Sequence, residues 1–116
     1  MAATVGYSRA VRVGPHVHVA GTAPIMPGES DPPPDAYAQT RRSLEIILAA
    51  LGEVGAKPEH VVRTRAYLID ADDWKDVGRA HGEVFGSVLP ASAVVVVKGL
   101  LDPRWRVELE ADALIT

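Results

Sequence analysis

Charged and apolar residues alternate strictly near the end of the chain. Every second position is charged, at Arg106, Glu108, Glu110 and Asp112. The positions around them are apolar, namely Trp105, Val107, Leu109, Ala111 and Ala113. Because successive side chains of a β-strand point to opposite faces of a sheet, the pattern predicts a strand with one face in the core. The opposite face would then carry carboxylates, and the question is what these carboxylates contact.

Other segments also have β-type patterns. Residues 7–13 and 17–21, separated by a Gly-Pro pair, predict a strand, a turn and a second strand. Residues 61–69 alternate in the same way, with Arg63, Arg65 and Tyr67 on one face and Val62, Thr64, Ala66 and Leu68 on the other. Residues 90–116 predict two strands joined by a Gly/Asp/Pro turn, which makes the end of the chain a hairpin.

Two segments have the three- and four-residue spacing of an amphipathic helix. The first follows a proline-rich loop of residues 23–34, begins at the N-cap residue Asp35 and ends at Gly55. Its apolar stripe is Tyr37, Thr40, Leu44, Ile47, Leu48, Leu51 and Val54. The second starts near Asp72 or Asp73. Its stripe, with the tryptophan interpreted as core, is Trp74, Val77, His81, Val84, Phe85 and Val88.

The order of these elements is ββαβαββ within a single domain of residues 1–116. Two helices and one mixed or mostly antiparallel sheet predict an α+β two-layer domain with both helices packed on one face of the sheet. A chain of this length buries enough surface for a core without disulfides.

The sheet face without helices needs its own explanation. It would carry Arg63, Arg65, Tyr67, Glu108 and Glu110, with His16 and His18 alongside. Such a face is either solvated or paired across a subunit interface through arginine–carboxylate contacts. The apolar run of residues 93–97 favours the interface, because apolar side chains pointing both ways indicate a strand buried on both faces.

Composition narrows the class of protein. The chain has no cysteine, which excludes disulfides, thiolate catalysis and cysteine-type zinc sites. Its net charge of −3 argues against sequence-independent nucleic-acid binding, which needs a basic surface. The sequence has neither an apolar run long enough to span a membrane nor a secretory signal pattern, so we expect a cytoplasmic location without membrane attachment.

Spacing alone suggests little chemistry. His16 and His18 share one strand face, but nothing marks a third ligand, so no metal site is predicted. His81 lies on the apolar stripe of the second helix, where a hydrogen-bonded core histidine is a simpler interpretation than a base. Glu108 and Glu110 would either divide acid and base roles or be neutralised by nearby arginines.

Several segments, taken together and in order, resemble the Rid (reactive intermediate deaminase, YjgF-like) family. They are GYSRAVRVG, VHVAGTAP, YAQTRRSLEIILAAL, VVRTRAYLIDADDW, GRAHGEVFG, LPASA and VELEADA. The resemblance implies a chorismate-mutase-like fold assembled as a homotrimer with ligand clefts between subunits. It also implies hydrolysis of small imines and enamines to a keto acid and ammonia, with no metal or cofactor.

The resemblance extends to individual residues. Tyr7 matches a cleft tyrosine, Gly21 the glycine that ends the second strand, and Glu108 the glutamate proposed to position the attacking water. Ala20 replaces the usual serine. Ser92 stands where deaminating members carry a carboxylate-binding arginine, so the chain resembles a divergent subgroup that lacks it. The arginines considered as replacements are Arg9, Arg63, Arg65 and Arg104.

Two classes of function follow. The first is a hydrolase or deaminase acting on a small substrate that need not be charged, with Glu108 activating water and Tyr7 and Ser92 orienting the ligand. The second is a non-catalytic trimer that binds a metabolite or a client protein through the same cleft, as the missing arginine suggests. RNA cleavage, a weaker third alternative, would need a basic groove.

Overall fold

The computed structural model of the protein describes the backbone of residues 2–116 and the side chains from residue 4 onward. The elements that form the domain follow the predicted order. They are β1 (Ala10–Val13), β2 (His16–Thr22), α2 (Ala36–Glu53), β3 (Val61–Leu68), α3 (Trp74–Phe85), β4 (Ala91–Val96) and β5 (Val107–Leu114). A short helix α1 (Ala2–Val5) precedes them, and 3-10 turns at Pro27–Glu29, Pro58–His60 and Ala71–Asp73 lie in the connections.

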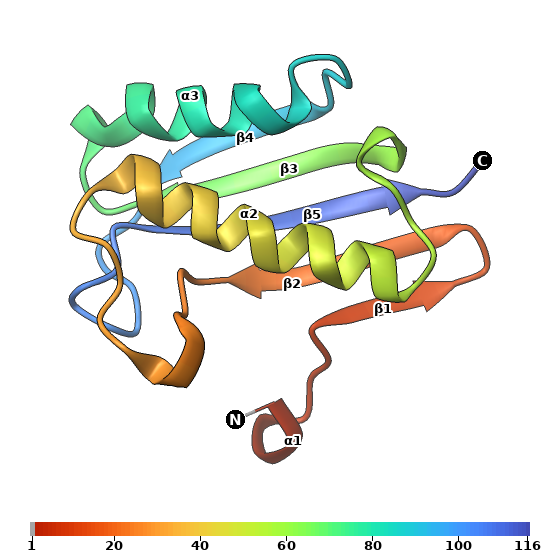
Figure 1. The fold of residues 1–116 in the computed structure, drawn as a ribbon, viewed down its shortest axis with the longest axis horizontal. Coiled ribbons are helices and arrows are strands. Elements are labelled where there is room, and N and C mark those ends of the chain that lie inside the picture. Colours follow the sequence, from red (N-terminus) through yellow and green to blue (C-terminus); the bar gives the residue numbers. More distant parts are fainter. Residues whose placement is uncertain (1) are drawn as a thin grey trace.

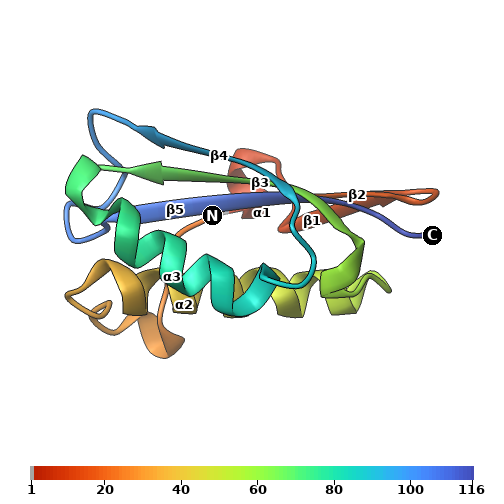
Figure 2. The same cartoon turned by 90° about the horizontal axis from the view of Figure 1, so that it is seen from above.

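The strands form one five-stranded sheet in the order β1-β2-β5-β3-β4. The β3–β4 pair is parallel and the other pairs are antiparallel, so the sheet is mixed. Both long helices lie against the same face of the sheet, which is clearest when the sheet is seen edge-on (Figures 1 and 2). The predicted two-layer α+β domain, with two helices on one face of a mixed sheet, is confirmed.

The core lies between the helices and the sheet. Its largest fully buried side chains include Phe85, Leu44, Ile47, Leu51, Leu68 and Leu109. Helix α2 begins where the sequence predicts, because the Asp35 side chain accepts a hydrogen bond from the backbone N–H of Ala38 at 2.9 Å. Just past its end, Gly55 adopts a φ of 86°, a left-handed conformation that suits glycine.

The last two strands do not form the predicted hairpin. Strand β4 pairs with β3 in parallel, and β5 lies between β2 and β3. A parallel neighbour requires a crossover connection, which α3 supplies between β3 and β4. The chain between β4 and β5 therefore crosses to the far side of β3 rather than making a tight turn.

Three predicted side-chain positions are wrong. Val62 is half exposed because the β3–β5 register shifts between Val61 and Arg63, which places Val61 in the core instead. Strand β5 begins at Val107, so Arg106 precedes it and bonds both carboxylate oxygens of Asp73 at 2.9 Å. Trp74 is 59% exposed. Helical spacing predicts which side of the helix a residue lies on, but not whether the sheet extends far enough to cover it.

Strand β4 is an edge strand, and all six of its residues are exposed in the single chain. Val94, Val95 and Val96 retain 44–55% of their accessible surface. The prediction that this strand is buried on both faces therefore does not hold within one chain. Among the described residues, no helix is both long and apolar enough to cross a membrane.

Candidate functional site

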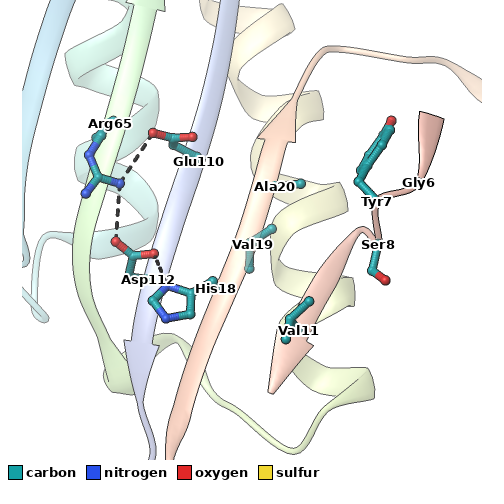
Figure 3. A pocket seen from close by; sticks show the side chains of 10 residues that line it. All are labelled: Gly6, Tyr7, Ser8, Val11, His18, Val19, Ala20, Arg65, Glu110 and Asp112. Atoms are coloured by element: carbon teal, nitrogen blue, oxygen red, sulfur yellow. Dashed lines mark hydrogen bonds and ion pairs between the residues drawn. The ribbon is translucent and has the colours of Figure 1, made fainter. Parts of the chain in front are cut away.

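The sheet face that carries no helix, here called the open face, holds an ordered row of charges from β3 and β5. Glu110 accepts hydrogen bonds from Tyr67 Oη at 2.6 Å and from Arg65 Nη1 at 3.3 Å. Asp112 contacts the same Arg65 nitrogen at 3.2 Å and His18 Nδ1 at 2.7 Å (Figure 3). Two of the three β5 carboxylates are thus paired. The predicted neutralisation by arginine, which concerned Glu108 and Glu110, holds for Glu110 alone.

Glu108 differs from its two neighbours along β5. Within residues 2–116, its carboxylate accepts no hydrogen bond and forms no salt bridge. Partial burial raises the pKa of this carboxyl above its ordinary value, the Arg9 charge opposes that rise, and Glu110 adds to it. A half-buried carboxylate without a partner and with a raised pKa is suited to proton transfer.

Gly21 leaves the space that the Glu108 side chain occupies. A Cβ built at Gly21 would lie 2.6 Å from Glu108 Oε2, which is far closer than a van der Waals contact. The pairing of β2 with β5 is irregular between Val19 and Thr22, and this irregularity contains Gly21. The absence of a side chain at residue 21 therefore allows the carboxylate to lie where it does.

Arg9 connects Gly21 to Tyr7. Its Nη1 donates to the Gly21 carbonyl at 2.8 Å and to Thr22 Oγ1 at 2.7 Å. Its guanidinium carbon lies 6.0 Å from the centre of the Tyr7 ring, which is 38% exposed. The structure thus gathers Tyr7, Gly21 and Glu108 around Arg9. The residue spacing of the sequence could not single out Arg9 from the four candidate arginines, because its contacts with Gly21 and Thr22 depend on the irregular pairing of β2.

Two shallow hollows border this group. The first, of about 430 Å³, is lined by Gly6, Tyr7, Ser8, Val11, His18, Val19, Ala20, Arg65, Glu110 and Asp112 (Figure 3). The second, of about 460 Å³, is lined by Tyr7, Pro24, Ile25, Met26, Glu29, Ser30, Leu101, Asp102, Arg104 and Trp105. Tyr7 lines both hollows, whereas Glu108 and Gly21 line neither. Neither of these two hollows therefore encloses the Glu108 carboxylate.

Ser92 lies apart from the other predicted site residues. In the β3–β4 register it is opposite Thr64, whose hydroxyl donates to Ser92 Oγ at 2.9 Å. The Thr64 hydroxyl in turn lies 2.8 Å from His81 Nε2. Thr64 is buried and packs on the helix side of the sheet, so Ser92 does not share the open face with Glu108 in one chain.

His81 behaves as a hydrogen-bonded core-edge histidine. Burial lowers the pKa of its imidazole, and the ring centre lies 4.9 Å from that of Phe85. If the Thr64 hydroxyl donates to Ser92, the Nε2–H of His81 must donate to Thr64. This chain of donors leaves the hydroxyl hydrogen of Ser92 available to a ligand.

The two histidines of β2 do not gather further metal ligands. His16 and His18 are exposed, and His18 already bonds Asp112. Across the described side chains, there is no group of three or more histidine or carboxylate residues placed to hold a metal ion.

Comparisons with known proteins place this site in context. The family model described as endoribonuclease L-PSP matches residues 1–115. A crystal structure from Mycobacterium tuberculosis, Rv2704, described as a member of the YjgF/YER057c/UK114 family, is 45% identical. It superposes with a TM-score of 0.89 over 98% of this chain and 91% of the other.

Two curated relatives extend the comparison. An uncharacterized protein of Streptomyces coelicolor is 40% identical over 112 residues, covering 93% of this chain and 81% of the relative. The 2-iminobutanoate/2-iminopropanoate deaminase of Escherichia coli is 28% identical over 111 residues, covering 93% and 86%. Because the family model spans nearly the whole chain and the fold agrees, the protein belongs to the endoribonuclease L-PSP family, the YjgF-like or Rid family that its sequence segments resemble.

Proposed function

We propose that the protein is a cofactor-independent hydrolase that converts a small imine or enamine into a carbonyl compound and ammonia. The unpaired, half-buried Glu108 carboxylate carries this proposal, because it is the one β5 carboxylate not engaged by a neighbour in the described chain. The deaminase activity in the name of the Escherichia coli relative supports the reaction class.

The chemistry needs one group that accepts and returns a proton. Ionised Glu108 takes a proton from water as the water oxygen attacks the imine carbon, and then returns that proton to the imine nitrogen, which gives a carbinolamine. Glu108 next takes the proton of the new hydroxyl group and delivers it to the amine nitrogen, so that the carbon–nitrogen bond breaks, the carbonyl forms and ammonia leaves. An enamine enters the same sequence after its β-carbon gains a proton and its nitrogen loses one, which converts it to the imine.

We also propose that the reaction takes place in a cleft completed by a second chain of a homotrimer. Glu108 lines neither of the two hollows described above, and Ser92 lies on the exposed edge strand β4. A neighbouring subunit docked on the open face would enclose the carboxylate and cover Val95, which is 44% exposed.

Sedimentation should give a mass of three times the 12.3 kDa of the chain. Val95→Lys is expected to shift the protein to monomers, because it places a charge in the proposed interface opposite Tyr67. Trp74→Lys is the control, since Trp74 is exposed on a helix of the other layer and its replacement should leave the trimer intact. A wild-type protein that sediments as a monomer would contradict the proposed assembly.

Gly21→Ala should reduce imine hydrolysis about a hundredfold, because the new methyl group displaces the Glu108 carboxylate by roughly an ångström. The free energy of unfolding should change by less than about 1 kcal/mol, since the displaced atom is the end of a flexible side chain. Gly99→Ala is the matched control, because nothing lies within 4 Å of a Cβ there. Equal activity in the two variants would show that the close approach is unimportant.

A non-catalytic binding module is the alternative function. Ser92 favours it, because the resemblance leads us to expect a carboxylate-binding arginine there and the structure instead turns this residue toward Thr64. Purified protein assayed for ammonia release from imines, with and without a carboxylate, separates the two functions. Thermal stabilisation by such ligands without any turnover would support the binding module.

A further inference from the structure

The second hollow, between the proline-rich loop and the connection that leads into β5, has mostly apolar walls. Its volume of about 460 Å³ lies within the range of small-molecule sites, roughly 300–1,000 Å³. The apolar residues that line it are Tyr7, Pro24, Ile25, Met26, Leu101 and Trp105. Ile25 and Leu101 are 44% and 85% exposed, so an apolar group bound there would remove apolar surface from water.

The walls of this hollow are held together by hydrogen bonds that do not require a ligand. The fully buried Gln39 amide donates to the carbonyl of Pro33, in the proline-rich loop, and to that of Arg104, in the opposite wall. Arg104 also bonds Asp31 at 2.6 Å and Asp102 at 2.7 Å, and the contact with Asp31 links the two walls a second time. Because the walls are connected in advance, little conformational entropy is lost when a ligand enters.

The hollow lies at the same end of the sheet as Glu108. Gly21, whose missing side chain makes room for the Glu108 carboxylate, is three residues before Pro24. Trp105 is three residues before Glu108, and three residues of chain span at most about 11 Å. A substrate whose reactive carbon lies at Glu108 is therefore near enough to place a substituent in the hollow.

The charges around the hollow favour an uncharged substituent. Asp102 and Glu29 line it, and Asp31 is bonded to Arg104, which also lines it. The hydrogen bond from Arg104 lowers the pKa of Asp102 to about 2, so this carboxylate is ionised at neutral pH. Glu29 forms no salt bridge with a described residue. Three carboxylates beside one guanidinium repel an acidic substituent.

We propose that the second hollow binds a large apolar substituent of the substrate, so that the protein prefers imines and enamines that carry an aryl or branched alkyl group. This inference rests on the proposed function and deepens it by naming the substrate class. The rings of Tyr7 and Trp105 provide surfaces on which an aryl group packs. Each methylene group buried there should tighten binding about fourfold, whereas an acidic group of similar size should gain nothing.

Three ketones that share one carbon skeleton test this assignment without requiring turnover. They are butan-2-one, 4-phenylbutan-2-one and 4-oxopentanoate, which carry hydrogen, phenyl and carboxylate at the same carbon. NMR titration of isotope-labelled protein measures the three affinities, and Trp74→Phe identifies which of the two tryptophan indole signals belongs to Trp105. The phenyl ketone should bind about tenfold or more tightly than the other two ketones. It should move the Trp105 signal and leave that of Trp74 in place.

Leu101→Asp should weaken binding of 4-phenylbutan-2-one about tenfold and change that of butan-2-one less than about threefold, because it places a charge in the apolar wall. Leu89→Asp is the matched control, since Leu89 is also an exposed leucine, at 79%, but does not line the hollow. Equal affinities for the phenyl ketone and butan-2-one would overturn the assignment. So would an unmoved Trp105 signal or an equal loss of affinity in the two variants.

The outcome for the hollow can be separated from that for the proposed hydrolase. If the phenyl ketone binds as expected but 4-phenylbutan-2-imine, generated in place by an amine oxidase, is hydrolysed no faster than without the protein, the binding site stands and the proposed function fails. If imines are hydrolysed at rates that depend neither on the substituent nor on Leu101, the proposed function stands and the assignment of the hollow fails.

Discussion

Glu108→Gln is expected to lower the turnover number for imine hydrolysis by about a hundred- to ten-thousandfold, the usual contribution of a general base. Glutamine has nearly the shape of glutamate, so the Gly21 contact is retained while the ability to accept a proton is lost. Ammonia release from 2-iminobutanoate, generated in place by an amino-acid oxidase, measures the effect. The variant should keep the oligomeric state of the wild type, because Glu108 has no partner in the described chain.

The pH dependence gives an independent test of the same residue. Burial raises the pKa of Glu108 above the ordinary 4.5, so the ionised base should be lost as pH falls through a value higher than that. The acid limb of the wild-type profile should therefore lie above pH 4.5 and be absent from the residual activity of Glu108→Gln. Glu110→Gln is the control, since Glu110 is held by Arg65 and Tyr67, and its profile should keep this limb. Full activity in Glu108→Gln would refute the assignment.

Gln39→Leu is expected to reduce the free energy of unfolding by about 3 kcal/mol, because three backbone groups would each lose a partner. The fully buried Gln39 amide donates to the carbonyls of Pro33 at 2.7 Å and Arg104 at 3.0 Å. Its oxygen accepts from the backbone N–H of Arg106 at 2.7 Å. Leucine has a similar volume but satisfies none of these groups. Urea unfolding of the two proteins measures the difference.

Ser43→Ala provides the matched control on the same helix. Ser43 is also fully buried, but its hydroxyl has no hydrogen-bond partner in the described structure. Removing that hydroxyl should leave stability unchanged or raise it by up to about 1 kcal/mol. If Gln39→Leu and Ser43→Ala change the free energy of unfolding equally, the hydrogen bonds of Gln39 to Pro33, Arg104 and Arg106 do not stabilise the protein.

Alternation and helical spacing were sufficient to predict the elements and the layers. The strict period of β5 reflects a central strand whose buried side, from Val107 to Ala113, faces the helices while Glu108 and Glu110 face away. The Asp35 cap and the apolar stripe located α2. These features depend on residues that are close together in the chain, so they can be predicted from the sequence alone.

Pairing and side-chain direction were harder to predict, because they depend on residues far apart in the chain. Nothing near Ser92 indicates that β4 pairs with β3, or that this serine contacts Thr64 on the helix side. The contact of Arg9 with Gly21 arises from the irregular pairing of β2 with β5. The candidate site therefore became apparent only when these strands were placed side by side.

The close approach of Gly21 to Glu108 also links the two positions in evolution. A side chain at residue 21 displaces the end of the residue 108 side chain only while that residue is as long as glutamate, because the close contact is with its terminal oxygen. A shorter residue at 108 would vacate the space, so the effects of the two substitutions should not add. In descendants of this sequence, a joint change at both positions would mark a lineage that has given up or rebuilt the chemistry while keeping the fold.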